Sequence, residues 1–516
     1  MAKVIINRWD GGLSLSERPQ TINEQSSSQG FDIFRDSFRL TKIDNLTTNE
    51  TAAGASVTTG ECPVFDATKR ASDGRIIGVG QTSGSSSVTF RFYRKDSSIT
   101  GTWQQNSSAG NVVTNYNAYA VLYKDVQYGY YTQSSESRLY RYDSDSAHTL
   151  IGTTADYHPS ITPKPVVHSQ DNILYMATNK TVSKYDGTTF TASAVTLPYY
   201  VSSMCEFGTY LAIACQSPEG GVIYLWGRDT SLTTMQDVIK VDNGKLQIIE
   251  NLDGYLVAIT ETPYDPYTGA IGISGSYKTI TARMYIGGSM KKIQSTFLGS
   301  NENGANQLLS HKKAIRDGTL IFSTGSNYLM RFGLNQNGQY VMSRDAQAAG
   351  GSKTLVNQYG FFVLGDYLFS SFRASSGSPS EGLLYRSNSL NNSGTDEFVS
   401  TAYYVTTINP SMPIGDRMKD KILTKVALKF YSLSTSTGTV TVKVSIDNGT
   451  NYTTLISQNA ATTAFPTKYY RIEADADTNG ASFPTGVEFL FRIETTYKID
   501  PIEFFYDYEV TNSLIS

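Results

Sequence analysis

The sequence contains no apolar run long enough to cross a membrane or to form the core of a signal peptide. Polar side chains interrupt its first residues, MAKVIINRWDGG, after a short apolar stretch. We therefore expect a chain that is made and kept in soluble form, with no membrane insertion.

Charge is also scarce. Charged side chains make up 17% of the residues, and 43 basic against 46 acidic groups leave a formal net charge of -3. No long block carries one sign, which argues against bulk attraction to nucleic acid. We expect no specific nucleic-acid binding.

Cysteine is rarer still. Cys62, Cys205 and Cys215 are an odd number spread over 516 residues, unlike a disulfide framework. Buried free thiols are the favoured interpretation, and a Cys205–Cys215 pair is the alternative. The four histidines show no metal-binding spacing.

Helical periodicity is missing, because apolar residues recur mostly at period two in short runs. Gly, Ser, Thr and Asn are abundant, and aromatic residues reach 12%. This mixture favours strands and turns. The sequence therefore predicts an all-β chain.

The alternating runs repeat along the chain. Examples are SVTFRFYRKD from Ser87, SRLYRYDSD from Ser137, GGVIYLWGRDT from Gly220 and EGLLYRSNS from Glu381. Each ends in turn-forming residues, and most follow a more continuous apolar run such as NILYMAT or YLVAIT. A spacing of roughly 40 to 55 residues is typical of one four-stranded propeller blade. A closed ring of such blades has only short, protected edges, whereas a series of β-sandwiches is the competing interpretation.

After about Ser400 the strands become longer and alternate more cleanly, as in ILTKVALKFYSL and GVEFLFRIETT. This texture predicts a compact antiparallel sandwich. The first residues, with the stretch NEQSSSQG, have too little apolar surface to fold alone and predict an arm that docks on its own body or on a neighbour. The predicted architecture is an extended N-terminal arm (1–49), a six- or seven-bladed β-propeller (50–400) and a C-terminal β-sandwich (401–516).

Two groups of polar residues could carry catalysis. Asp143, Asp145 and His148 lie close together, but the comparable stretches KYDGTTF and WGRDTSL keep an aspartate without a histidine, so we interpret the aspartates as turn formers. Asp507 and Glu509 are two apart on one strand, roughly 7 Å from each other on one face, as two glycosidase carboxyl groups can be. The solvent-exposed face of a half-buried strand would also carry such carboxylates, and this structural interpretation is favoured.

Two loops near the C-terminus have recognisable turn patterns. SIDNGTNY, residues 445–452, resembles the Asp-box hairpin, in which Asp447 binds the backbone and Gly449 takes a positive φ. DADTNG, residues 475–480, fits the start of a calcium loop with Asp475, Asp477 and Asn479 as ligands. Its twelfth position is Gly486 instead of glutamate, so a solvated hairpin loop is the main interpretation and calcium the alternative. No other cofactor is expected.

The arm motifs INRWDGGL and FDIFRDSFRL, the Tyr-rich repeats and the terminal stretch VKVSIDNGTNY together resemble the β-propeller virion proteins of tailed bacteriophages. These include tail nozzle, tail-tip and fibre-associated components. The resemblance implies a structural, oligomeric and non-enzymatic role in the virion. It also implies that the particle is assembled in the host cytoplasm. It also implies other virion or tail proteins as partners, and it supplies no site residue.

Two other functions stay open. Exposed aromatic side chains would suit a module that binds a host glycan or receptor during attachment. A propeller glycosidase is the third possibility and would depend on Asp507 or Glu509.

Overall fold

Every element that the structure describes is a β-strand, as the sequence predicts. The computed structural model describes residues 2–6, 27–28, 31–32, 34, 41–42, 48–53, 64–83, 88–95, 98–106, 118–132, 136–156, 162–228, 235–241, 244–264, 277–298, 312–323, 328–347, 353–355, 360–374, 381–387, 401–406, 419–432, 439–447, 451–459, 469–475, 483–486, 489–495 and 499–514. Within these ranges no helix has the length and apolar character needed to span a membrane.

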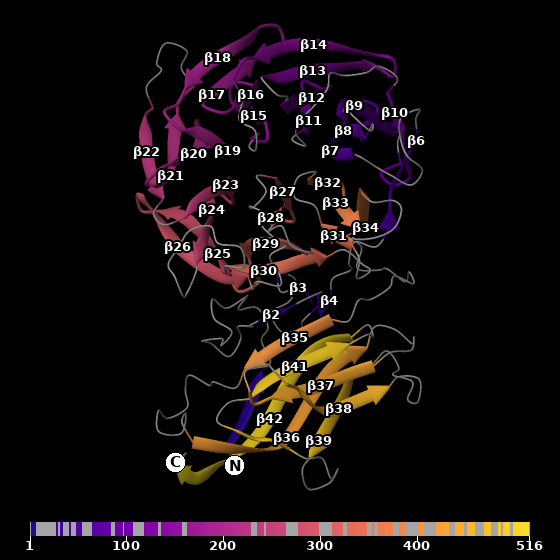
Figure 1. The fold of residues 1–516 in the computed structure, drawn as a ribbon, viewed down its shortest axis with the longest axis vertical. Helices are drawn as coiled ribbons and strands as arrows, with labels where there is room; N and C mark the ends of the chain where they lie inside the picture. The colour runs from indigo at the N-terminus through magenta and orange to yellow at the C-terminus, as the bar shows by residue number, and fades with distance from the viewer. Residues whose placement is uncertain are drawn as a thin grey trace.

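Seven antiparallel sheets stand around a common axis in the described part of residues 48–387 (Figure 1). Consecutive strands of each sheet are neighbours, so each sheet is a meander that runs from the axis to the rim. The predicted β-propeller is confirmed. We call the sheets blades one to seven, in chain order.

The strands nearest the axis are β7 (Val64–Lys69), β11 (Ala118–Tyr123), β15 (Val166–His168), β19 (Tyr200–Phe207), β23 (Lys245–Leu252), β27 (Lys313–Arg316) and β32 (Phe361–Leu364). The second strands are β8 (Ile76–Ser83), β12 (Val126–Thr132), β16 (Ile173–Thr178), β20 (Tyr210–Ser217), β24 (Tyr255–Tyr264), β28 (Thr319–Ser323) and β33 (Tyr367–Ala374). The third strands are β9 (Val88–Lys95), β13 (Ser137–Ser144), β17 (Thr181–Tyr185), β21 (Gly220–Trp226), β25 (Tyr277–Ile286), β29 (Tyr328–Leu334) and β34 (Glu381–Ser387). The outer strands of blades one to six are β10 (Thr102–Gln105), β14 (Ala147–Thr154), β18 (Phe190–Thr196), β22 (Asp237–Val241), β26 (Ser289–Leu298) and β30 (Tyr340–Gln347). A short strand, β31 (Lys353–Leu355), also pairs with β33.

The hairpin between the first and second strands has the same turn chemistry in several blades. Lys124 and Asp125 both have positive φ angles, as do Asp253 with Gly254 and Asp317 with Gly318. Two consecutive residues with positive φ form the type I′ turn, whose twist matches that of the flanking strands. The repeat is therefore set by a short turn followed by a buried strand.

The N-terminal segment closes the ring. Strand β5 (Thr48–Asn49) pairs with β34 at the outer side of blade seven, and β6 (Thr51–Ala53) pairs in parallel with β10 of blade one. Glu50, between them, donates its backbone N–H to the carbonyl of Leu383 at 2.8 Å. Residues 48–53 thus join the last blade to the first, and we call them the clasp.

The side chain of Glu50 is buried beneath the clasp. Its carboxylate faces the ammonium of Lys95, and it accepts hydrogen bonds from the Trp103 indole at 2.9 Å and the Gly101 backbone N–H at 3.1 Å. Lys95 also lies over the Trp103 ring, 4.5 Å from its centre. Burial raises the pKa of Glu50, and the donors around it oppose that shift. A charge in this position is stabilised only while its partners stay in place.

Two further sheets lie below the ring in Figure 1. One contains β1 (Ala2–Ile6), β42 (Ile499–Leu514), β36 (Lys419–Ser432) and β39 (Tyr469–Asp475), with β40 (Thr485–Gly486) beside β36. The other contains β2 (Ser27–Ser28), β35 (Thr401–Thr406), β41 (Leu490–Thr495), β37 (Thr439–Ser445) and β38 (Thr453–Asn459). Apolar side chains of both sheets, including Leu428, Val442, Phe491 and Phe504, form one shared buried cluster.

Segments of the first 53 residues lie in both bodies. Strands β1 and β2 extend the lower sheets, whereas β5 and β6 belong to the ring. Between them, β3 (Phe31–Asp32) pairs with β4 (Thr41–Lys42). Phe34 is buried, with the Arg331 guanidinium of blade six 4.6 Å from its ring centre. In the described ranges, this segment docks on the chain's own sheets.

Aromatic packing holds neighbouring blades together. Phe90 of blade one stacks on Tyr131 of blade two with ring centres 4.3 Å apart, and Tyr175 of blade three meets Trp226 of blade four edge-on at 5.8 Å. Such pairs fill the space between twisted sheets with large apolar surface. Cys205 and Cys215 are buried free thiols, as favoured from the sequence, and Cys62 lies outside the described residues.

Candidate functional site

Two consecutive lysines of blade six point across the axis of the ring. The ammonium of Lys313 donates to the carbonyls of Met204 at 2.7 Å and Ile249 at 2.6 Å, and it pairs with the Glu250 carboxylate at 2.9 Å. An ammonium has three hydrogens, so these partners use them all. Lys313 therefore ties the inner strands of blades four, five and six together.

Lys312 extends to the opposite side. Its ammonium donates to the carbonyl of Ala118 at 2.9 Å and lies 3.8 Å from the centre of the Tyr119 ring. Burial lowers the pKa of Lys312 to about 7, and the nearby Asp66 carboxylate opposes that shift. Lys312 thus links blade six to blade two and to Asp66 of blade one.

Asp66 is the buried acid of this group. It accepts the backbone N–H of Ala67 at 3.0 Å and that of Ala120, in blade two, at 3.2 Å. The Lys164 ammonium lies 3.7 Å from its carboxylate. Burial raises the pKa of Asp66, against the effect of the two lysines. We call Asp66, Glu250, Lys312 and Lys313 the axial hub.

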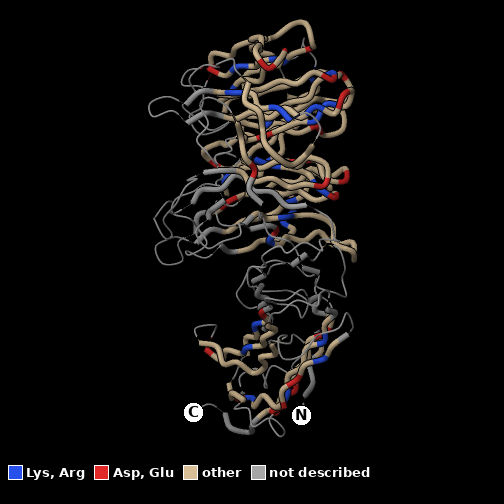
Figure 2. The backbone as a smooth tube through the Cα atoms, turned by 90° about the vertical axis from the view of Figure 1, so that its right-hand side faces the viewer, with Lys and Arg blue, Asp and Glu red and all other residues tan. Residues whose placement is uncertain are grey.

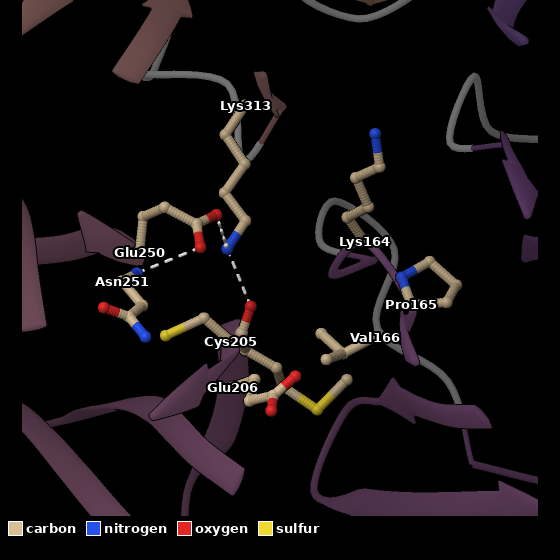
Figure 3. A pocket seen from close by; sticks show the side chains of 9 residues that line it. Lys164, Pro165, Val166, Cys205, Glu206, Glu250, Asn251 and Lys313 are labelled. Atoms are coloured by element: carbon tan, nitrogen blue, oxygen red, sulfur yellow. Dashed lines mark hydrogen bonds and ion pairs between the residues drawn. The ribbon is translucent and has the colours of Figure 1, made fainter. Parts of the chain in front are cut away.

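A cavity of about 320 Å³ opens beside the axial hub (Figure 3). Its lining is partly apolar and partly polar, and it consists of Lys164, Pro165, Val166, Met204, Cys205, Glu206, Glu250, Asn251 and Lys313. The volume suits a small molecule or several waters.

Most polar groups of the cavity already have partners within the protein. The Glu206 carboxylate accepts the backbone N–H of Ser169 at 3.0 Å and also binds its hydroxyl. Glu250 is held by Lys313. Burial raises the pKa of the Cys205 thiol, which keeps it protonated and weakly nucleophilic. In contrast, the buried Oδ1 of Asn251 has no hydrogen-bond donor, so this atom could receive one from a bound molecule.

A second polar cluster joins blades three and four. His168 is fully buried, and its Nε2 lies 3.2 Å from the Tyr210 carbonyl, which can only accept; Nε2 therefore carries the proton. Its Nδ1 accepts from the Arg228 guanidinium at 2.9 Å, and Arg228 pairs with Asp171 at 2.6 Å. This arrangement holds the imidazole in one orientation between two blades.

The Asp143, Asp145 and His148 group lies at the β13–β14 hairpin. The Asp143 carboxylate accepts from Arg141 at 2.7 Å and from the Thr149 hydroxyl at 2.5 Å, and Asp145 binds Arg94 of blade one. The His148 ring packs edge-on against Tyr140, with ring centres 5.0 Å apart. These contacts are structural, but side chains make them, whereas the sequence interpretation expected each aspartate to bind the backbone of its own turn.

The Asp-box hairpin is described in part. Asp447 accepts the Ser445 hydroxyl at 2.6 Å and the Asn451 backbone N–H at 2.9 Å, and these bonds lower its pKa to about 2. This is the predicted turn chemistry. Gly449 lies outside the described residues.

The other predicted residues lie in the sheet of β36, β39 and β42. Asp507 and Glu509 share one side of β42, and the register places Lys425 opposite Asp507. Asp475 ends β39 and pairs with Lys425 at 3.1 Å, while Asp477 and Asn479 lie outside the described residues. The calcium loop therefore stays a prediction. The described ranges contain no group of three or more His, Cys, Asp or Glu residues placed to hold a metal.

The axial hub and Glu50 were not found from the sequence. One available signal was charge at positions of the inner strands, as in VFDATK around Asp66 and KKAIRDG around Lys312. A charged residue in such a strand must find a partner in the ring. The identity of that partner depends on which blades meet at the axis, and local spacing does not contain this information.

No family model matches the sequence. A search of curated proteins gives no match either. Solved structures do match. An aldose sugar dehydrogenase from Streptomyces coelicolor is 12% identical, with 64% of this chain and 96% of that chain covered and a TM-score of 0.35. A fructofuranosidase from Schwanniomyces occidentalis is 6% identical, with 90% and 97% covered and a TM-score of 0.29. The Dos1 propeller is 10% identical, with 66% and 94% covered and a TM-score of 0.37.

These similarities concern the fold alone. They nevertheless correct one expectation. The prediction that this chain is not an enzyme does not stand, since the structures similar to it include a dehydrogenase and a fructofuranosidase; the shared fold does not decide whether this chain catalyses a reaction. Of the resemblance to phage virion proteins, the β-propeller is the part that the comparisons support.

Proposed function

We propose that this chain is a structural component of the tail of a tailed-bacteriophage virion and assembles there as an oligomer with other virion proteins. The observation that carries the proposal is the path of the N-terminal segment. It contributes β1 and β2 to the lower sheets and β5 and β6 to the ring. The backbone therefore crosses between the two bodies twice, once before the ring and once after it.

A double crossing is what a part that transmits force needs. A binding module joined by one linker can swing freely, whereas two crossings restrict rotation of one body against the other. Buried Phe34, which contacts Arg331 of blade six and belongs to the apolar cluster of the lower sheets, adds a contact between them. The motifs INRWDGGL and FDIFRDSFRL, which carry the resemblance to virion proteins, fall in this same segment.

Glycan recognition has less support in the described residues. Large exposed apolar side chains there are mostly aliphatic, and Tyr255 is the aromatic one among them. Stacking on sugars uses aromatic faces. The outer faces of the lower sheets instead carry ion pairs such as Lys429–Glu503 and Lys443–Glu494.

The test uses particles grown from the genome that encodes the chain. Quantitative mass spectrometry of purified particles is expected to find the chain at a fixed copy number. A nonsense mutation in its gene is expected to give incomplete particles that a plasmid copy restores. Absence of the chain from purified particles, or complete infectious particles without it, would end the proposal.

A further inference from the structure

Exposed apolar side chains gather on one face of the ring. In the described residues the large ones are Ile5, Leu150, Val238, Tyr255, Ile286, Ile315, Leu334, Ile422 and Ile446. Four of these nine, Tyr255, Ile286, Ile315 and Leu334, belong to blades five and six and are all between 42% and 44% exposed. Single exposed apolar residues are ordinary, but a group of neighbours indicates an interaction surface.

The meander topology places these four residues on the same face. Tyr255 follows the turn from the first to the second strand of blade five, and Ile286 precedes the turn from its third to its fourth strand. Ile315 and Leu334 precede the corresponding turns of blade six. In a meander these two turns lie at the same end of the sheet, so all four side chains lie near one face of the ring. Figure 2 shows the ring edge-on above the lower sheets. We call these four residues the turn patch.

The turn patch is held rigidly. Asp253 with Gly254, and Gly287 with Gly288, have the positive φ angles of tight hairpin turns. Tyr255 meets Tyr340 of blade six edge-on at 6.0 Å, and the Tyr340 hydroxyl donates to the Asp253 carboxylate at 3.3 Å. A surface built from fixed hairpins loses little freedom when it binds.

The charges beside the turn patch are separated. Asp253 and Asp317 lie in the turns close to the axis. The buried Arg316 guanidinium donates to the Asp366 carbonyl at 3.0 Å and lies 3.7 Å from the Asp317 carboxylate, so part of the Asp317 charge is compensated. Exposed Lys291 and Lys292 lie on β26, the outer strand of blade five. The axial edge of the patch is therefore acidic and its rim edge is basic.

We propose that the turn patch binds the turn patch of a second copy of this chain, in a two-fold face-to-face dimer. The two-fold axis lies in the plane of the interface and is perpendicular to the radius of the ring. Such an axis places the axial edge of one patch opposite the rim edge of the other, so the acidic edge of each copy meets the lysines of the other. The four apolar side chains meet between these edges and lose their contact with water. The dimer deepens the oligomeric part of the proposed function, but its test needs only the purified chain.

The apolar contribution is tested by sedimentation velocity on the full-length chain over a range of concentrations. The wild type is expected to form dimers. The double variant Ile286→Asp with Leu334→Asp is expected to weaken the dimer at least tenfold. Leu150→Asp is the matched control, because the Leu150 side chain, on β14 of blade two, is about as exposed as those of the patch. This variant is expected to dimerise as the wild type does.

Charge exchange supplies the sharper test. Lys291→Glu with Lys292→Glu is expected to weaken the dimer, and adding Asp253→Lys with Asp317→Lys is expected to restore it. Lysine suits these turn positions, because Lys124 occupies the corresponding one in blade two with a φ of 51°. Melting curves establish that each variant is folded.

Two results would overturn the proposal: a wild type that stays monomeric at every concentration, or a dimer that the apolar and charge variants leave unchanged. The first result would overturn it even if a glycan or another protein bound the patch. Presence of the chain in particles is measured separately, so the virion role and the dimer can fail independently.

Discussion

Glu50 is the residue whose side chain completes the ring. It lies between β5 and β6, so its carboxylate can reach Lys95, Trp103 and Gly101 only when blade one and blade seven are joined. The sequence around it, TTNETAA, has no apolar alternation and no turn signal. Its importance follows from the partners that the closed ring provides.

We predict that Glu50→Gln lowers the free energy of unfolding by about 3 kcal/mol, the range for breaking a buried ion pair from one side. Glutamine keeps the size and an acceptor oxygen but removes the charge that faces Lys95. Chemical denaturation followed by tryptophan fluorescence measures the change, since Trp103 is a direct partner.

The matched control is Glu473→Gln. Glu473 pairs with Arg471 on an outer sheet face where both side chains are more than 40% exposed. Surface pairs of this kind contribute about 0 to 1 kcal/mol. Equal losses in the two variants would show that Glu50 does not hold the clasp.

Lys312 should make stability depend on pH. Its folded pKa of about 7 lies below its unfolded value, so the unfolded chain binds the extra proton between these two values. Stability therefore rises with pH in this window, and the cost of charging Lys312 is fully present below it. Relative to Lys312→Met, which cannot titrate, the wild type should gain about 1.4 kcal/mol per pH unit between pH 7 and pH 10.

Denaturant unfolding of both proteins at several pH values measures this difference. Subtracting the unfolding free energy of the variant removes the contribution of groups that titrate alike in both proteins. A difference that stays constant across the window would contradict a lowered pKa of Lys312 in the folded chain.

At the scale of elements, alternation along the chain was enough to predict strands and the ring. Period two is visible wherever one side of a strand is buried, as in SRLYRYDS of β13. The turn repeat was also readable: LDGYLVAI and RDGTLIF each place Asp-Gly before a buried second strand. The short strands β2, β5 and β6 could not be predicted, because two or three residues carry no periodicity.

We predict that Gly254→Val lowers stability by about 1 to 2 kcal/mol, whereas Gly254→Asn costs less. Gly254 has a φ of 85° and nothing lies near a Cβ built there, so the cost comes from the backbone alone. A β-branched residue tolerates this region poorly and asparagine tolerates it better. Thermal melting of the two variants beside the wild type measures the order, and equal melting points would contradict a type I′ turn.

At the scale of the molecule, both ends of the chain lie in the lower sheets. Ala2 pairs with Tyr508, although the whole sequence of the ring lies between them. A pairing at this separation leaves no local trace, so the sequence predicted an arm but not its place as a strand beside β42. For the same reason it did not reveal that Lys312 and Lys313 meet several blades at the axis.

This closure predicts how the chain responds to being reconnected. Because β1 and β42 are adjacent, a flexible linker of about ten residues can join the two ends of this sequence. New ends between Gly287 and Gly288, in an exposed turn of blade five, leave the clasp intact and should give a chain that melts close to the wild type. New ends between Glu50 and Thr51 separate β5 from β6 and should give a lower melting midpoint, because the first and last blades are then held by two independent, very short strands. Circular dichroism on the two permutants compares them directly. Equal midpoints would mean that the ring stays closed through packing of its blades, without help from the continuous clasp.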